Sequence, residues 1–282
     1  MIYHSEDTFK GVGELALYYQ AWLPEGKLKA ILVIVHGLGA HSSRFGNIIE
    51  QLLPQEYAIY AFDMRGNGRS PGQRGYINSW AEFREDLRIF IELIQNLHPA
   101  CPIFIMGHSL GGVVVLDYIL RHPQAAATLQ GAIALAPAIG KVGVSKFRLF
   151  LGKLLSRIWP QFSLSTGIDL SAASRDQKVI SAYAADPLRH TLGTARLATE
   201  YFATVDWIYA HAGEWQLPLL ILHGAADTVA LPEGSEIFYQ LVTYQDKLRI
   251  VYPDAYHELQ SDINYPEVMK DLETWLEQHY AC

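Results

Sequence analysis

Three residues of this chain have the types and the chain order of a nucleophile, an acid and a base. Ser109 lies between two glycines in Gly107–Gly111, which reads GHSLG, and Asp227 and His257 follow in the segments HGAAD and YPDAYH. A serine hydroxyl attacks a carbonyl carbon efficiently only when a base removes its proton and an acid orients that base. The set therefore predicts nucleophilic catalysis, with Ser109 attacking, His257 transferring the proton and Asp227 holding the imidazole.

The surroundings of Ser109 favour this interpretation over a glycine-rich packing turn. The apolar run Ile103–Met106 precedes the turn, and the helix-forming run VVVLDYIL follows it. A sharp strand-to-helix turn projects the serine side chain and leaves no room for bulky neighbours, which is why Gly107 and Gly111 suit it. The start of the helix also offers amide groups to a developing negative charge.

The other candidates for the acid and the base are less suited to those roles. Asp254 stands in the same loop as His257, which favours a solvated turn aspartate. His223 ends a predicted strand and His108 stands inside the serine turn, so packing or hydrogen bonding is the expected role of both. His279 is close to the end of the sequence and is expected to be exposed.

The oxyanion of a tetrahedral intermediate needs two hydrogen-bond donors. The turn at Ser109 supplies one, the backbone N–H of Leu110. We expect the second from the segment HGLG, which begins at the end of the apolar run ILVIVH, and assign it to the backbone N–H of Leu38. A plain tight turn is the alternative interpretation of HGLG.

Parallel strands are the elements that would bring these residues together, because each residue follows a different apolar run. Such runs alternate with stretches of helical period, which is typical of an α/β protein with a largely parallel sheet. Strands are predicted at residues 16–23, 30–36, 58–63, 103–106, 131–135, 219–223 and 248–252. Helices are predicted from Trp80 to Leu97, with Ser79 as the N-cap, and from Pro266 to His279.

The alternation stops after Pro137 and resumes at Pro218. The sequence therefore predicts a core in two parts, residues 1–137 and 216–282, with an insert of helical and irregular character at residues 138–215. Ligand sites of parallel sheets lie at the carboxyl ends of the strands, so the insert is expected to cover the site as a cap.

Composition narrows the function classes. The 282 residues, 50% hydrophobic and 18% charged, suffice for one large domain with an insert. The net charge of −7, from 22 Lys and Arg against 29 Asp and Glu, disfavours a nucleic-acid partner. No apolar run approaches the roughly 20 residues that cross a bilayer, and the sequence does not start as a secretory signal. Cys101 and Cys282 make neither a disulfide framework nor a metal cage, so we expect a cytoplasmic protein.

The motifs together resemble those of the monoacylglycerol lipase family of serine hydrolases. The resemblance extends from about residue 22 to residue 275 and rests on HGLGAHSSRF, DMRGNGRSPGQRGYI, GHSLGG, HGAADTVALPEGS and YPDAYHEL, with SRDQKVISAYAADPL in the insert. It implies the α/β-hydrolase fold, with a mostly parallel eight-stranded sheet flanked by helices and a helical cap. It also implies hydrolysis of single-chain acyl esters such as monoacylglycerols through an acyl-serine intermediate, without a metal or cofactor.

Matched residue by residue, Ser109, Asp227 and His257 fall on the family's triad, and Leu38 and Leu110 fall on its oxyanion positions. A non-catalytic binding protein on the same scaffold normally lacks one member of the triad, and here none is missing. Dehalogenase or epoxide hydrolase chemistry would require an aspartate in place of Ser109. Lysophospholipase or broad esterase activity stays open, whereas a serine aminopeptidase needs an acidic group for the substrate's amine, which an apolar and basic cap disfavours.

Two further positions, Arg44 and Tyr183, match polar residues near the alcohol end of the family's substrate. Animal members read HGxGEHS, whereas this chain reads HGLGAHS. Ala40 therefore replaces an acidic residue that helps to organise the polar end. The alcohol moiety of the substrate is left open by this departure.

An amphipathic stretch of the insert, residues 141–157, reads KVGVSKFRLFLGKLLSR. At about 100° per residue, a helix here has one apolar and one basic side. The apolar side continues to residue 158 and holds Phe147, Phe150, Leu151, Leu154, Leu155 and Ile158, and the basic side holds Lys146, Lys153 and Arg157. Two interpretations stay open and can coexist. The apolar face covers an acyl pocket, with Phe147, Leu151 and Leu154 contacting the substrate, or it lies transiently in a membrane surface.

Overall fold

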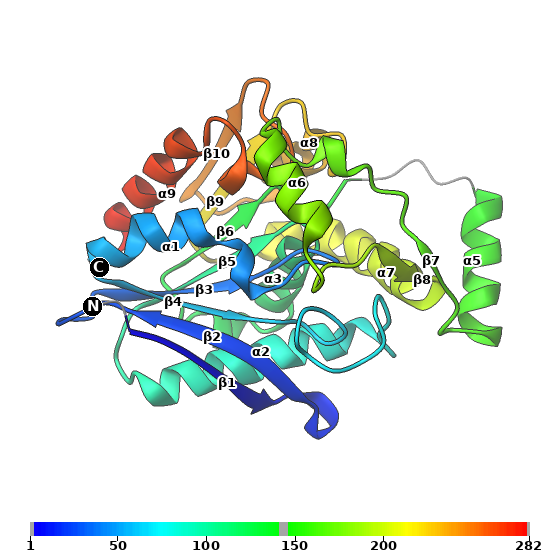
Figure 1. The fold of residues 1–282 in the computed structure, drawn as a ribbon, viewed down its shortest axis with the longest axis horizontal. Coiled ribbons are helices and arrows are strands. Elements are labelled where there is room, and N and C mark those ends of the chain that lie inside the picture. The colour runs from blue at the N-terminus through cyan, green and yellow to red at the C-terminus, as the bar shows by residue number, and fades with distance from the viewer. Residues whose placement is uncertain (1–2, 141–145, 281–282) are drawn as a thin grey trace.

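The chain folds around one sheet of eight strands (Figure 1). A computed structural model describes residues 3–140 and 146–280, without the side chains of residues 146–151. The strand order is β1-β2-β4-β3-β5-β6-β9-β10, with β2 antiparallel to β1 and β4 and all other neighbours parallel. The strands are β1 (Tyr3–Lys10), β2 (Ala16–Leu23), β3 (Ala30–Val35), β4 (Tyr57–Phe62), β5 (Ile103–His108), β6 (Gly131–Leu135), β9 (Leu219–Gly224) and β10 (Lys247–Tyr252). The seven predicted strands are confirmed to within two residues at each end, and the α/β class with them.

Alternation along the central strands explains the helical layers on both faces of the sheet. β3 is fully buried, yet Ile31 and Val33 pack into one core cluster while Leu32 and Ile34 pack into another. Successive side chains of a strand point to opposite faces, so each face receives every second residue. One face is covered by α2 (Trp80–Leu97), α3 (Leu110–Arg121), α7 (Ala195–His211) and α8 (Pro232–Leu241), and the other by α1 (Gly46–Leu52) and α9 (Tyr265–His279).

The sequence did not predict β1, the edge strand of the sheet. Its segment YHSEDTFK is almost entirely polar, and only Phe9 is buried, so no alternation marks it as a strand. Pairing with β2 from Tyr3↔Leu23 to Lys10↔Ala16 holds the strand in place. The Phe9 ring also packs against Phe62 and Phe90. Tertiary pairing therefore decides the conformation of this segment.

Helix predictions hold for bounds and buried faces. α2 begins and ends as predicted, and its stripe Phe83, Leu87 and Phe90 is buried. The predicted mechanism at its start was wrong, because Ser79 occupies the N-cap position but its side chain makes no capping hydrogen bond. Instead the Trp80 amide donates to Glu200 of α7, at 2.9 Å. The predicted terminal helix is α9, one residue longer at its start.

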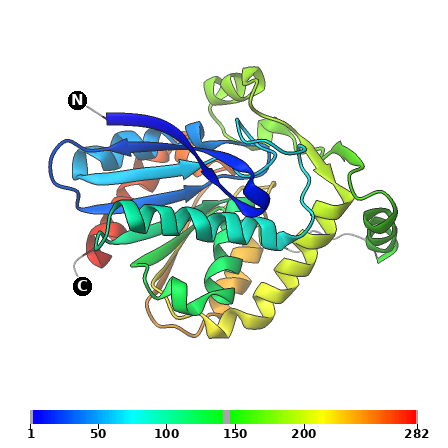
Figure 2. The ribbon, with the colours of Figure 1, turned by 90° about the horizontal axis from the view of Figure 1, so that it is seen from below.

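The segment between β6 and β9 divides between the core and a projecting part. It contains α5 (Lys146–Ile158), a ribbon of β7 (Ser163–Ser165) and β8 (Leu192–Thr194), α6 (Gln177–Ala185) and α7. α7 packs on α2 and α3, so it belongs to the layer that covers the sheet. α5 contacts α7 and stands away from the body of the molecule in both Figure 1 and Figure 2. A short helix, α4 (Pro123–Ala126), follows α3.

Candidate active site

The turn between β5 and α3 holds Ser109 in a conformation that few residues adopt. Its φ of 55° and ψ of −121° are sparsely populated by non-glycine residues, and such strain persists only where the surroundings enforce it. A Cβ at Gly107 would lie 2.3 Å from the carbonyl oxygen of Gly111, and one at Gly111 would lie 2.2 Å from that of Val35. Two of the glycines in the motif are therefore required by backbone contacts that cannot move.

The structure brings Ser109, His257 and Asp227 into one chain of hydrogen bonds. The Ser109 hydroxyl lies 2.9 Å from Nε2 of His257, whose Nδ1 lies 2.7 Å from Oδ2 of Asp227. The three residues follow the ends of β5, β9 and β10, which share one edge of the sheet because these strands run parallel. This arrangement gives the hydroxyl a proton acceptor and the imidazole an anionic partner.

Burial and hydrogen bonding set the charge states of the acid and the base. Burial alone would raise the pKa of Asp227, but hydrogen bonds from His223 and His257 lower it well below its usual range. The amides of Val229 and Ala230 also donate to its Oδ1, at 2.8 and 2.9 Å. For His257, burial favours the neutral form, but Asp227 outweighs burial and raises the pKa above its ordinary 6.5. Asp227 is thus an anion at neutral pH. It accepts the Nδ1–H of His257, and this hydrogen bond orients the ring so that Nε2 faces Ser109.

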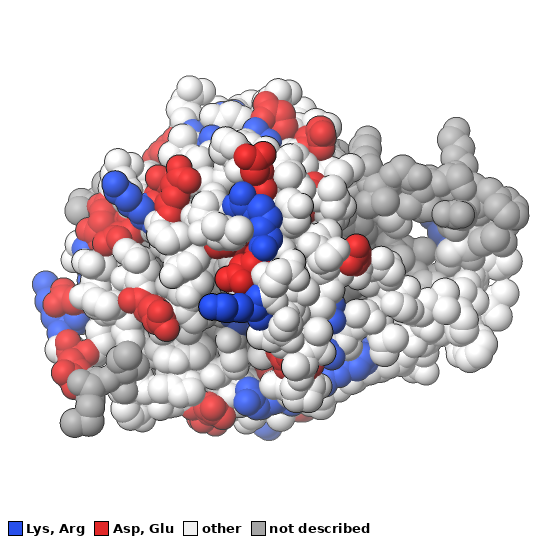
Figure 3. Space-filling model, turned by 45° about the horizontal axis from the view of Figure 1, so that its top comes forward, with Lys and Arg blue, Asp and Glu red and all other residues white. Residues whose placement is uncertain are grey.

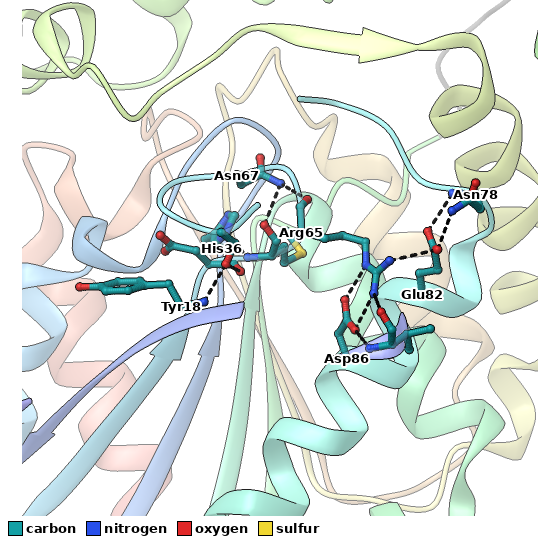
Figure 4. Close-up of polar contacts among 11 residues, drawn as sticks. Tyr18, His36, Arg65, Asn67, Asn78, Glu82 and Asp86 are labelled. Carbon is teal, nitrogen blue, oxygen red and sulfur yellow. Dashed lines mark hydrogen bonds and ion pairs between the residues drawn. The ribbon is translucent and has the colours of Figure 1, made fainter. Parts of the chain in front are cut away.

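The turn after β3 lies directly against the serine. A Cβ on Gly37 would be 3.0 Å from the Cβ of Ser109. His36 fixes the turn, because its Nδ1–H donates to the Gly37 carbonyl at 2.7 Å and its Nε2 accepts from the Met64 amide at 2.9 Å (Figure 4). Burial lowers the pKa of His36 to about 4, so the ring is neutral and can make both contacts.

The two amides predicted to bind the oxyanion are available for it. Leu110 is the first residue of α3, where an N–H has no partner inside the helix. Among the described residues, neither the Leu38 amide nor the Leu110 amide donates a backbone–backbone hydrogen bond. Both amides belong to segments next to Ser109. Leu110 follows Ser109 in the sequence, and Leu38 follows Gly37, which lies against Ser109 in space. An oxyanion forming at the serine would satisfy them.

A cavity beside Ser109 is lined by both the core and the insert. The predicted residues Arg44 and Tyr183 both line it, and the Arg44 guanidinium stacks on the Tyr183 ring. The Tyr183 hydroxyl donates to Glu258 at 2.9 Å, and Arg44 pairs with Asp186 at 3.1 Å. The cavity therefore has a polar end built from one ion pair and one hydrogen bond to a carboxylate.

Sequence reasoning missed Glu258 and Asp186 at this polar end. Glu258 directly follows His257, so its position beside the base was a signal that could have found it. Asp186 comes from the insert and reaches both Arg44 and His41, which the sequence gives no means of predicting. Ala40 lines the same cavity, so the acidic groups here come from other segments of the chain.

The predicted acyl contacts of the insert are only partly tested. Leu154 is 45% exposed and does not line the cavity, so the prediction that it contacts substrate there is corrected. The side chains of Phe147 and Leu151 lie outside the described residues. Ile168 and Leu170 line the cavity instead.

The alternative histidines and acid have structural roles. Asp254 is an exposed turn residue with a φ of 58°. His108 is buried and contacts the His257 carbonyl, and His223 is buried between Ser235 and the Ala230 carbonyl. His223 also lies 3.3 Å from Asp227, so it supports the acid. The prediction for His279 was wrong: it is half-buried and its ring stacks on Trp275.

The part of the chain that the structure describes contains no group of three or more His, Cys, Asp or Glu side chains with the geometry to hold a metal ion. Within 3–140 and 146–280, no helix combines the length and the apolar character needed to cross a bilayer.

Comparison with known proteins agrees with this site. A family model described as serine aminopeptidase, S33, matches residues 26–264. A monoacylglycerol lipase of Mycolicibacterium smegmatis is 32% identical over 279 residues, which cover 98% of each chain. The chain belongs to this family of serine hydrolases.

Further relatives carry the same activity in their names. The monoglyceride lipase of Homo sapiens is 27% identical, over 94% of this chain and 88% of that protein. The crystal structure of the Paleococcus ferrophilus monoacylglycerol lipase is 32% identical, covers 99% of both chains and superimposes with a TM-score of 0.82. The resemblance to monoacylglycerol lipases and the α/β-hydrolase fold are confirmed, and the chain is a carboxylester hydrolase of this type.

The raised pKa of His257 predicts how activity depends on pH. The imidazole acts as a base only when neutral, so kcat/KM should rise with pH along a limb whose midpoint lies above 6.5. Replacing Asp227 by Asn removes the anion that raises this pKa, so the limb should move to lower pH, and kcat should fall by roughly 10⁴. The measurement is kcat/KM for a non-ionising soluble ester across the pH range.

Asp254→Asn is the matched control, because it changes a carboxylate in the same loop as His257 that faces solvent. It should leave both the rate and the midpoint unchanged. An unshifted midpoint in the Asp227 variant would contradict the assignment of the acid.

Proposed function

We propose that this chain hydrolyses monoacylglycerols through an acyl-enzyme intermediate on Ser109. The observation that carries the proposal is the continuous path from the Ser109 hydroxyl through His257 to Asp227, next to two unpaired amides and a cavity with one polar end. The relatives named above are monoacylglycerol lipases. Their activity agrees with what this geometry can do.

The proposed reaction uses each group in turn. Nε2 of His257 takes the Ser109 proton as the oxygen attacks the ester carbonyl, and the amides of Leu38 and Leu110 hold the resulting oxyanion. Collapse of the intermediate breaks the ester bond, and His257 returns the proton to the departing alcohol. A water activated by the same imidazole then releases the fatty acid and restores the serine.

Aminopeptidase activity, which the family description includes, is not favoured by the site. Such an enzyme must hold a substrate ammonium group with a free carboxylate. Here Asp186 already pairs with His41 and Arg44, and Glu258 accepts hydrogen bonds from Tyr183 and Gln260. Both acids at the cavity therefore have partners within the protein. Lysophospholipase or broader esterase activity is the alternative that a substrate panel would separate.

The nucleophile can be tested with a fluorophosphonate probe, which reacts with activated serines. The chain should be labelled, and Ser109→Ala should abolish labelling and lower kcat by roughly 10⁶. Ser181→Ala, which changes an exposed serine of α6, should leave both unchanged. Labelling that persists in Ser109→Ala would contradict the proposal that Ser109 is the nucleophile.

The acyl chain should increase the rate. Leu38, Ile168, Leu170 and Val229 line the cavity, so an acyl chain there loses contact with water. Each buried CH₂ contributes about 0.8 kcal/mol, so kcat/KM should increase from acetyl to medium and long chains. The measurement is a series of 1-monoacylglycerols of increasing chain length, kept below their aggregation concentrations, with lysophospholipids and plain esters beside them. A flat or falling series would contradict a lipid substrate.

We also propose that the part of residues 138–215 that precedes α7 acts as a cap and that α5 rests on a lipid surface. Leu154, Ile158 and Trp159 are 45%, 73% and 59% exposed, although they are apolar. α5 packs on α7 through its other side, where Ser156 is buried. Residues 139–168 hold five basic residues and no acidic one. Exposed apolar side chains beside basic ones suit an anionic membrane surface.

This contact can be tested by sedimentation with vesicles that contain phosphatidylglycerol. The chain should bind them, and the double variant Ile158→Ser/Trp159→Ser should bind clearly less because it loses apolar area in the interface. Hydrolysis of a soluble ester should not change. Ile237→Ser removes an equally apolar, 45% exposed side chain from α8 and should bind as the wild type does. Equal binding by the double variant and the wild type would refute the lipid contact.

A further inference from the structure

His190, a residue of the insert, contacts the turn that carries the Leu38 amide. The backbone N–H of His190 donates to the Gly39 carbonyl at 3.1 Å. Its Nε2 lies 2.9 Å from Oδ1 of Asn67, and the same oxygen accepts the Gly39 N–H at 3.0 Å. Both backbone groups of Gly39 are therefore bound, one by His190 directly and the other by the oxygen that His190 also contacts.

The donors and acceptors of this set are mutually consistent. Nδ1 of His190 accepts from the Leu192 amide at 3.1 Å, so Nε2 carries the proton that Asn67 accepts. The side-chain amide of Asn67 donates to the Arg65 carbonyl at 3.0 Å (Figure 4). Its oxygen is then the atom that accepts the Gly39 N–H. Burial, with the nearby charge of Arg74, lowers the pKa of His190 to about 4, so the ring is neutral at neutral pH.

Steric contact reinforces the hydrogen bonds. Gly39 has a φ of 70°, and a Cβ there would lie 1.9 Å from the His190 carbonyl oxygen. Only glycine allows the insert to approach the turn this closely. A second attachment nearby, from the Thr194 amide and hydroxyl to the Gly75 carbonyl, fixes the strand that follows His190.

We propose that His190 and Asn67 are positioning residues that hold the Leu38 amide in place for the oxyanion, so that transition-state stabilisation depends on the docked position of the cap. The proposal rests on the proposed function. The Ser109–His257–Asp227 chain is formed entirely by the core, so replacing the His190 side chain should leave proton transfer intact. The replacement keeps the backbone contact with Gly39 and removes the Nε2 contact that holds Oδ1 of Asn67 against the Gly39 N–H. Figure 3 shows Lys and Arg side chains interspersed with Asp and Glu side chains over the body of the molecule.

The first test compares rates on a soluble short-chain ester. His190→Ala should lower kcat by roughly 10- to 100-fold and leave KM nearly unchanged, because a displaced oxyanion donor weakens the transition state more than the ground state. His190→Gln, which keeps a side-chain N–H donor, should recover part of the loss. His190→Phe keeps the ring volume without the donor and should lose kcat as the alanine variant does. Lys178→Ala, an exposed change in α6, should behave as the wild type.

Coupling between the two residues gives a second test. Asn67→Ala removes the acceptor for both Gly39 and His190, so adding His190→Ala should lower kcat by much less than it does in the wild type. Independent, multiplying losses would show that the two residues do not act as one unit.

An inhibitor pair separates positioning from a general structural role. An alkyl trifluoromethyl ketone adds to the serine and places an oxyanion at the two amides, whereas the alcohol of the same chain does not. His190→Ala should weaken the ketone by the same factor as kcat/KM and leave the affinity for the alcohol unchanged. Equal weakening of both ligands, or an undiminished kcat in both the Ala and the Phe variants, would overturn the proposal. Failure of the wild type to react with fluorophosphonate would instead defeat the proposed function.

Discussion

The backbone strain at Ser109 is the constraint on which the site depends. A positive φ at a non-glycine residue is held only because the end of β5 and the start of α3 are both fixed in the buried core. The same close packing requires glycine at Gly107 and Gly111, where a side chain would collide with neighbouring carbonyl groups. The turn therefore projects one hydroxyl at the edge of the sheet while the rest of the motif stays buried. Everything else in the site is arranged around that fixed oxygen.

Electrostatic support for the nucleophile comes from groups that water does not reach. Asp227 and His257 are both buried, and the carboxylate is stabilised by two backbone amides as well as by two histidines. A charge in such an environment interacts strongly with its partners because little solvent screens it. An imidazolium that formed at His257 would thus be paired in advance. His223 belongs to the same buried network, because it contacts the Ala230 carbonyl and lies beside Asp227.

The insert contributes residues to the polar end of the cavity and to the turn at Gly39, and it supplies none of Ser109, Asp227 and His257. Through Tyr183 and Asp186 it completes the polar end of the cavity around Arg44, and through His190 it reaches the turn at Gly39. Its α5 stands away from the core and leaves apolar side chains exposed. α7, in contrast, is part of the layer on the sheet. One continuous segment therefore contributes to the layer on the sheet, to the polar end of the cavity and to an exposed apolar surface.

The sequence by itself determined the local features whose signals are local. Apolar runs predicted seven of the eight strands of the sheet, helical period predicted α2 and α9, and the glycines around Ser109 predicted the strained turn. Since parallel strands end at a common edge, the order of Ser109, Asp227 and His257 along the chain also indicated that they would meet.

Only the tertiary structure decided what depends on contacts between distant segments. β1 carries no apolar alternation because its place is set by pairing with β2, and Leu154 faces solvent because packing on α7 uses the other side of its helix. Glu258 and His190 reach the cavity, and Asp186 reaches Arg44, through the path of the insert and the loops, and no pattern of neighbouring residues encodes that path.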